Sequence, residues 1–108
     1  MEDVEAENGA PLTISFDKDG DRIVMTLEGE LDLSSAPKLR DAVDGALQSD
    51  PGHLVLDLHG LRFMDSSGIA ALVHTQSRIT TLTLRQPAEL ILRVLAITGL
   101  TEVFKVEQ

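Results

Sequence analysis

The sequence predicts an α/β fold, a single domain in which a mixed sheet of four to five strands is covered by about three helices. Two patterns indicate this fold. Apolar and polar residues alternate in two segments near the N-terminus, as in strands with one buried face. Further along, short apolar runs alternate with segments whose apolar residues recur at helical spacing, which is typical of parallel strands joined by helices. The predicted order is therefore β-β-α-β-α-β-α, with an N-terminal hairpin, parallel later strands and right-handed crossovers.

The chain opens with a tail and a hairpin. Residues 1–10 carry four carboxylates and few apolar groups, so we expect an acidic, disordered tail before a domain that spans residues 11–108. Residues 17–21, which are Asp-Lys-Asp-Gly-Asp, favour a turn and are expected to separate the first two strands. The apolar faces of these strands are Leu12, Ile14 and Phe16 in the first, and Ile23, Met25 and Leu27 in the second.

The first helix is expected to begin after two serines. Ser34 and Ser35 are suitable N-caps, and Pro37 fits a first helical turn, where its missing N–H costs nothing. The helix presents one apolar stripe, consisting of Ala36, Leu39, Val43, Ala46 and Leu47.

A short apolar run at residues 54–58, bounded by His59-Gly60, predicts a strand covered on both faces. An Asp-Ser-Ser-Gly junction follows at residues 65–68, and the second helix is expected to start within it. Polar side chains there lie at the positive end of a helix dipole, among N–H groups without intrahelical partners. In this helix Ile69, Leu72, Val73 and Gln76 fall at helical spacing, and the helix is expected to end near Arg78 or Ile79.

The last third of the chain adds a strand, a helix and a docked segment. Residues 81–85 alternate as a strand does, and Gln86-Pro87 starts the third helix. The apolar positions of this helix are Leu90, Ile91, Val94, Leu95 and Ile97. Gly99 suits a left-handed C′ position, with Leu100 folding back on Leu95 in a Schellman motif. The docked segment contains Val103, Phe104 and Val106.

Composition limits the classes of function. The 108 residues carry a formal net charge of −9, which disfavours nucleic acid and anionic membranes as partners. No cysteine is present, so disulfides, thiolate metal sites and cysteine nucleophiles are excluded. We see neither a signal-peptide pattern nor an apolar run of membrane length, and therefore expect a cytoplasmic protein without membrane insertion.

Enzymatic hypotheses find little support. A serine at a strand-to-helix junction is typical of some hydrolases, but the context is not Gly-x-Ser-x-Gly. A triad would need His53, His59 or His74 as its base, and these histidines lack zinc-ligand spacing. A magnesium cluster would draw on Asp32, Asp57 and Asp65, of which Asp57 lies inside a predicted strand. We therefore expect no enzyme, no catalytic residue, no metal and no cofactor.

Four motifs in order resemble the STAS domain, and in particular the anti-sigma factor antagonists of bacterial partner-switching systems. They are Leu-Glu-Gly-Glu-Leu-Asp at residues 27–32, Leu-Asp-Leu at 56–58, Phe-Met-Asp-Ser-Ser-Gly at 63–68, and Leu-Ala-Ile-Thr-Gly-Leu at 95–100. The resemblance covers about residues 12–105, and it implies a STAS-like single domain.

The resemblance implies a phosphorylation switch at Ser67, the second serine of the Asp-Ser-Ser-Gly motif. In that family the unphosphorylated protein binds an anti-sigma factor that is also a serine kinase, and the sigma factor is released. Phosphorylation then ends the complex, and a phosphatase is expected to reset it. The partner-binding residues are expected to be Asp32, Asp65, Ser66, Gly68 and Ile69.

One segment departs from the family pattern. Between Gly68 and Pro87 the chain is several residues shorter than usual, and Arg78-Ile79-Thr80 replaces the customary Gly-Gly turn. The second helix is part of the family's partner-binding surface, so this change bears on the identity of the partner. The alternative is a STAS subunit of an ABC-type lipid transporter or of a stress-signalling complex.

Overall fold

The computed structural model describes residues 11–108, and the tail predicted at residues 1–10 lies outside them. The described residues form one five-stranded sheet in the order β1-β2-β3-β4-β5. The elements are β1 (Thr13–Asp19), β2 (Arg22–Leu31), α2 (Ala36–Leu47), β3 (His53–Met64), α3 (Ser66–Gln76), β4 (Leu82–Arg85), α4 (Glu89–Ile97) and β5 (Lys105–Glu107). β1 pairs antiparallel with β2, and every later pair is parallel. The predicted α/β fold, with an N-terminal hairpin and three helices, is confirmed.

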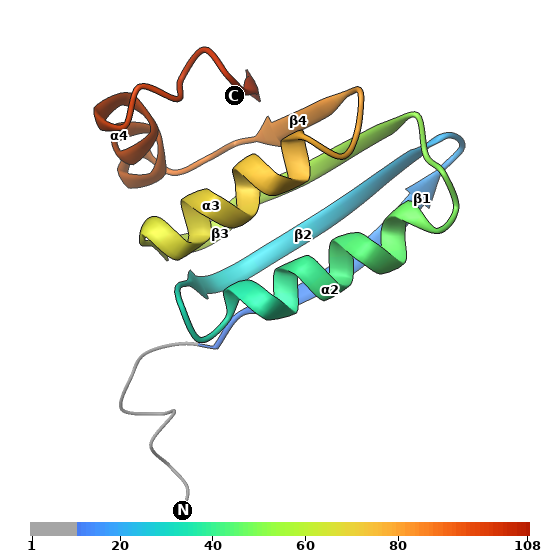
Figure 1. Cartoon of the computed structure of the whole chain (residues 1–108), viewed down its shortest axis with the longest axis horizontal. Coiled ribbons are helices and arrows are strands. Elements are labelled where there is room, and N and C mark those ends of the chain that lie inside the picture. Colours follow the sequence, from blue (N-terminus) through green and yellow to red (C-terminus); the bar gives the residue numbers. More distant parts are fainter. Residues whose placement is uncertain (1–10) are drawn as a thin grey trace, which may run out of the picture.

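The core lies between the sheet and its helices. Helices α2 and α3 run side by side over the same face of the sheet and pack against each other (Figure 1). The alternating apolar residues of β2 are buried as predicted, and α2 buries its stripe except for the half-buried Leu47. The largest fully buried side chains are Leu12, Met25, Leu27, Leu31, Leu39, Leu54, Leu56, Leu58, Leu61, Leu72, Leu84 and Ile91.

The prediction that Phe16 is buried was wrong. β1 is an edge strand that pairs with β2 alone, and Phe16 lies opposite Met25 in that pairing. Although Met25 is fully buried, Phe16 is 54% exposed, because it lies on the edge strand, which has no further strand on its outer side. The nearby Ile14 is half-buried against the core, so the apolar face of β1 is only partly used.

The third strand is longer than predicted. β3 continues through His59 and Gly60 as far as Met64, where it still pairs with Leu31 of β2. The pairing contains two register shifts, one between Thr26 and Glu28 and one between Gly29 and Glu30. Pairing with β2 resumes after each shift, so the strand continues past the Gly60 that suggested its end. β3 therefore runs directly into the junction that begins at Asp65.

Helix α3 buries mainly small residues. Its buried residues are Gly68, Ala71, Leu72 and Thr75, so Leu72 is the one of the four residues at helical spacing that is fully buried. Val73 is 39% exposed, and Ile69 and Gln76 are half-buried. Small residues at Gly68 and Ala71 let this face approach the sheet closely. The helix also ends at Gln76, earlier than predicted, and residues 77–81 connect it to β4.

Helix α4 ends in the predicted Schellman motif. The N–H of Leu100 donates to the carbonyl oxygen of Leu95 at 2.8 Å, and that of Gly99 donates to Ala96 at 3.1 Å. Gly99 has a φ of +76°, the left-handed conformation that this motif requires. Of the predicted apolar positions, Ile91 and Leu95 are buried, Val94 is half-buried, and Leu90 and Ile97 are exposed. In the predicted docked segment Phe104 is buried and Val106 lies in β5, which is parallel to β4, whereas Val103 is exposed.

Candidate functional site

The predicted site residues lie at the carboxyl ends of β2 and β3. β2 ends at Leu31 and is followed by Asp32, while β3 ends at Met64 and is followed by Asp65. Leu31 and Met64 are paired neighbours, so the two aspartates follow the sheet at the same edge. The N–H of Asp65 donates to the carbonyl oxygen of Leu31 at 3.2 Å, which joins the two segments. Open α/β sheets commonly place their functional sites at this edge.

Asp65 is the N-cap of α3. Its φ of −111° and ψ of −169° are extended, as is usual for a residue in this position. Its Oδ1 atom accepts hydrogen bonds from the N–H of Ser67 at 2.9 Å and from that of Gly68 at 3.2 Å. Two of the N–H groups that a helix start leaves unpaired are thereby satisfied. The prediction that the helix starts within the Asp-Ser-Ser-Gly segment is confirmed, because α3 begins at Ser66.

Gly68 determines how closely the first turn of α3 packs on the ends of β2 and β3. A Cβ atom at Gly68 would lie 2.6 Å from Met64 Cγ, 2.8 Å from Leu31 Cγ and 2.9 Å from the Leu31 carbonyl oxygen. No side chain fits at such distances without a shift, so glycine lets the first turn of α3 rest directly on the ends of β2 and β3. Gly68 is buried, and its contribution to any partner surface is to position its neighbours.

The two serines differ in exposure. Ser66 is exposed, and Ser67, one residue further into the helix, is half-buried. Within residues 11–108 the Ser67 hydroxyl group takes part in no hydrogen bond, whereas the Ser67 N–H is held by Asp65. The backbone of Ser67 is thus fixed while its hydroxyl group remains available. Ile69, the next predicted partner-binding residue, is half-buried and packs against the core.

Asp32 organises the loop that follows β2. Its Oδ1 atom accepts from the N–H of Ser34 at 3.0 Å and from that of Ser35 at 3.2 Å. It also accepts from the Ser34 hydroxyl at 2.7 Å and lies 3.2 Å from the Ser35 hydroxyl oxygen. Ser35 occupies the N-cap position of α2, but its hydroxyl donates back to the carbonyl oxygen of Glu30 at 2.9 Å instead of capping the helix. These bonds define a rigid loop of residues 32–35, the 32–35 loop.

The charge of Asp32 is stabilised by the same contacts. The Ser34 hydroxyl lowers the pKa of the Asp32 carboxyl group, and the donors of Ser35 and the Ser34 N–H lower it further. Partial burial opposes them but does not reverse the direction. Asp32 is therefore ionised at neutral pH, although it is half-buried.

Two exposed apolar residues at this edge were not predicted. Leu33, inside the 32–35 loop, is 76% exposed, and Phe63, next to the end of β3, is 42% exposed. The sequence does contain a signal for Leu33, because an isolated leucine lies among Asp32, Ser34 and Ser35 outside any periodic pattern. The signal for Phe63 was hidden by the unpredicted extension of β3.

The histidines do not assemble a catalytic site with Ser67. His53 begins β3 and lies about 35 Å along that strand from its other end. Its Nε2 atom is 2.8 Å from Thr83 Oγ1, and burial together with Lys105 lowers its pKa. His59 is exposed within β3, and His74 is exposed about two turns further along α3 than Ser67. Within residues 11–108, no histidine hydrogen-bonds to either serine of the junction.

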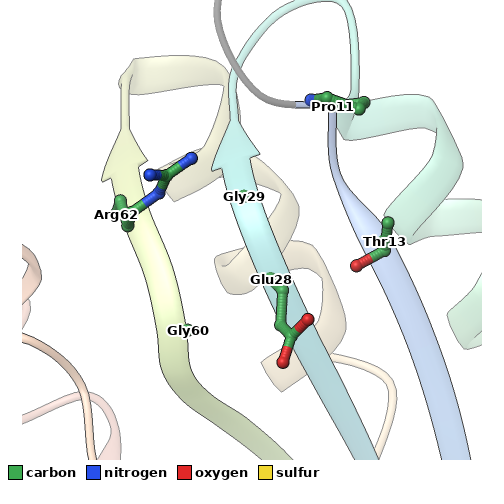
Figure 2. A pocket seen from close by; sticks show the side chains of 6 residues that line it. All are labelled: Pro11, Thr13, Glu28, Gly29, Gly60 and Arg62. Carbon is green, nitrogen blue, oxygen red and sulfur yellow. The ribbon is translucent and has the colours of Figure 1, made fainter.

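A hollow of about 380 Å³ lies elsewhere on the sheet. Figure 2 shows it in front of the strands, with helices behind them, so it opens on the face away from α2 and α3. Its lining residues are Pro11, Thr13, Glu28, Gly29, Gly60 and Arg62. None of the predicted site residues lines this hollow, and the sheet separates it from α3.

Two further properties concern the described chain. Among residues 11–108, no group of three or more His, Asp and Glu side chains is placed to hold a metal ion. No helix in the same range has the length and apolar character needed to cross a membrane.

The mixed sheet and the serine-bearing helix start at its parallel edge define the class of α/β domain to which the protein belongs. The sequence matches the family described as "Mlab, STAS domain" over residues 14–107. The chain therefore belongs to the STAS domain family.

Curated relatives share a common description. The anti-sigma-B factor antagonist of Listeria monocytogenes is 27% identical over 95 residues, which are 84% of this chain and 83% of the relative. The anti-sigma-F factor antagonist RsfB of Mycobacterium tuberculosis is 34% identical over 56 residues, which are 52% of this chain and 46% of the relative. The proteins that this chain resembles in sequence are thus anti-sigma factor antagonists.

Solved structures share the fold. An anti-sigma factor antagonist from Mycobacterium paratuberculosis has a TM-score of 0.82 at 24% identity, covering 89% of this chain and 85% of that chain. The unphosphorylated form of the Bacillus protein SpoIIAA has a TM-score of 0.72 at 20% identity, covering 89% of each chain. At these identities the likeness establishes the fold.

Proposed function

We propose that the protein is an anti-sigma factor antagonist whose binding is controlled by phosphorylation of Ser67. In its unphosphorylated form it binds a kinase-type anti-sigma factor, and the sigma factor held by that partner is freed. The partner then transfers the γ-phosphoryl group of its ATP to the Ser67 hydroxyl oxygen, with ADP as the leaving group and the hydroxyl proton passing to a base of the kinase. The phosphorylated protein dissociates, and a phosphatase hydrolyses the phosphate ester. The protein is a substrate in this cycle and catalyses none of its steps.

The observation that carries the proposal is the state of Ser67. Its N–H is held by Asp65, while its hydroxyl group makes no hydrogen bond within residues 11–108. It occupies the second position of α3 at an edge where sites commonly lie. The sequence relatives, which are anti-sigma factor antagonists, support the general role. SpoIIAA, which shares the fold, has been solved in a phosphorylated form, which supports this kind of modification.

Electrostatics explains how one phosphate can end binding without unfolding the protein. A phosphate group adds a charge of about −1.5 to −2 at neutral pH. At the N-terminus of α3 the helix dipole favours that charge, so the domain stays folded. Across an interface, the same charge, beside Asp65 and the ionised Asp32, is repulsive and costly to desolvate. The phosphate is therefore tolerated inside the domain and unfavourable in the complex.

The partner-binding residues proposed are Asp32, Asp65, Ser66, Gly68 and Ile69. Ser66 is exposed and can contact a partner directly, and Asp65 and Ile69 are half-buried. Gly68 is buried and acts by placing Ser66 and Ser67. The short link at residues 77–81 follows the end of α3 at Gln76 and is not part of its first turn.

The test begins with capture of the partner. Affinity-tagged Ser67→Ala protein, expressed in the native cell, is expected to retain a protein that mass spectrometry identifies as a kinase-type anti-sigma factor. That protein, purified and supplied with ATP, should phosphorylate the wild-type chain on Ser67, as intact-mass and peptide analysis would show. Ser66→Ala is the matched control, because it should still accept the phosphate.

Each other outcome has a defined meaning. Phosphate on Ser66 but not on Ser67 would refute the assignment of the residue and leave the mechanism. Binding of a kinase-fold partner that transfers no phosphate would refute the switch. Co-purification with a membrane ATPase would favour the alternative, a STAS subunit of an ABC-type lipid transporter, and co-purification with a large stress-signalling assembly would favour the other alternative.

A further inference from the structure

Leu33 is an apolar side chain that a rigid loop holds in water. It is 76% exposed, although the loop around it is among the most extensively hydrogen-bonded segments of the described chain. Single exposed leucines are ordinary on protein surfaces. Leu33 differs in that hydrogen bonds fix the loop that carries it, so its exposure belongs to one defined conformation.

The bonds that fix the loop come from both of its ends. The Asp32 carboxylate accepts from the N–H groups of Ser34 and Ser35, both of which follow Leu33 in the same turn. The Ser35 hydroxyl oxygen accepts from the N–H of Asp32 at 2.9 Å and the hydroxyl donates to the Glu30 carbonyl oxygen. The backbone on both sides of Leu33 is therefore set by contacts in which the leucine side chain takes no part.

The loop is also continuous with the start of α3. The carbonyl oxygen of Leu31, two residues before Leu33, accepts the N–H of Asp65, and Leu31 Cγ lies where a Cβ of Gly68 would be 2.8 Å away. The 32–35 loop is thus joined to the start of α3, where Ser67 lies, by one hydrogen bond and by the close packing of Leu31 against Gly68. An apolar anchor in this loop would lie at the same end of the sheet as Ser67.

We propose that Leu33 is the apolar anchor of the partner interface and that Asp32 is a positioning residue that presents it. This inference rests on the proposed function, because it assigns a partner to the surface around Ser67. Preorganised apolar side chains contribute strongly to binding, since no conformational freedom is lost when they enter a pocket. The partner surface that fits is an apolar pocket of the anti-sigma factor, beside the part of that protein that meets Ser67.

The test uses the protein captured by the Ser67→Ala chain, purified and titrated at fixed ionic strength. Adding Leu33→Ser to that chain should raise Kd by about tenfold or more. The midpoint of chemical denaturation should not change, because Leu33 buries little surface. Ile97→Ser is the matched control: Ile97 is 78% exposed, but lies on α4, and its replacement should change Kd by less than about twofold.

Asp32→Ala separates the positioning role of Asp32 from the anchor role of Leu33. It should speed hydrogen exchange of the Ser34 and Ser35 N–H groups in the free protein and also raise Kd, whereas Leu33→Ser should raise Kd and leave exchange unchanged. Unchanged binding by Leu33→Ser, or equal losses in Leu33→Ser and Ile97→Ser, would overturn the anchor. Unchanged exchange in Asp32→Ala would overturn the positioning role.

The outcome for the proposed function can be read separately. The class of the captured protein decides that function, while the effect of Leu33→Ser on the same protein decides the anchor. If the captured protein has no kinase fold, the switch fails, and the anchor stands or falls on the measured Kd. A chain that captures no protein would overturn both.

Discussion

The N–H of Asp65 donates to the carbonyl oxygen of Leu31 at 3.2 Å, so the residue that caps α3 is also fastened to the end of β2. Asp65 thereby connects three elements, because its side chain holds the first turn of α3 and its main chain continues β3. The stability of the site and its shape depend on the same residue. Four predictions follow from this arrangement and from the groups around it.

Replacing Asp65 should destabilise the domain in a way that depends on its acceptor atoms. Asp65→Ala removes the acceptor for two N–H groups and should lower the free energy of unfolding by about 0.5–2 kcal/mol. Asp65→Asn keeps an acceptor of the same size and should lose less. Urea denaturation of the three proteins measures the difference. Equal losses in both variants would show that the negative charge, and not the hydrogen bonds, stabilises this helix start.

Gly68→Ala should destabilise the domain, although alanine favours helices. The added Cβ would lie 2.9 Å from the Leu31 carbonyl oxygen, a backbone atom that cannot move aside easily. Overpacking of this kind costs about 1–3 kcal/mol and exceeds the gain of about 1 kcal/mol in helix propensity. Gly45→Ala in α2 is the control, because no atom lies within 4 Å of its added Cβ. It should stabilise the protein, and a stabilised Gly68→Ala would contradict the close packing.

The stability of the protein should fall as the pH is lowered below the ordinary pKa of histidine, in part because of His53. Burial lowers the pKa of His53, as do Lys105 and, to a lesser extent, Arg22 and Arg85, against an opposing effect of Glu107. The unfolded chain therefore binds this proton more readily than the folded protein. The free energy of unfolding should rise with pH between the lowered folded pKa and about 6.5 and stay level above it, as far as His53 contributes.

Denaturation curves between pH 5 and pH 8 would measure this slope. His53→Gln should reduce the slope, and His59→Gln serves as the control for the loss of an imidazole from the same strand. An unchanged slope in His53→Gln would show that the proton of this histidine is not linked to folding.

Ser67→Asp should fold as well as the wild-type protein. A carboxylate in the first turn of α3 gains about 0.3–1 kcal/mol from the helix dipole, which offsets its repulsion from Asp65. Circular dichroism and the denaturation midpoint should match those of the wild type, while affinity for the captured partner should fall, although by less than with phosphate, because aspartate carries less charge. A Ser67→Asp protein that is unfolded would show that the helix start does not tolerate an anion.

The sequence predicted best those features that depend on neighbouring residues. The hairpin, the cap within Asp-Ser-Ser-Gly and the Schellman motif at Gly99 each follow from a few adjacent side chains. The path of β3 past Gly60 could not be predicted in this way, because it depends on the pairing of β3 with β2. The burial of Gly68 and Ala71 on α3 was not visible either, because it depends on how closely the helix approaches the ends of β2 and β3.

The same distinction applies to the candidate site. The grouping of Asp65, Ser66, Ser67 and Gly68 was visible as a motif, and the structure places Asp32 beside them through the pairing of Leu31 with Met64. The hydrogen bonds of Asp32 within its own loop were not visible, because they depend on how residues 32–35 turn. The exposure of Leu33 follows from that turn, so only the structure could reveal it.

The fixed backbone around Ser67 has a consequence for timing. The proposed switch needs no refolding step, because the backbone around Ser67 is already rigid. The phosphorylation state of Ser67 therefore reaches the partner directly, as a difference in surface charge. Because no helix or loop has to rearrange, the switch would involve no delay for such motions and no partially switched forms. The lifetime of the signal would then be set by the turnover of the kinase and the phosphatase. A cell could lengthen or shorten its response by changing the amounts of these two enzymes, without any change in this chain.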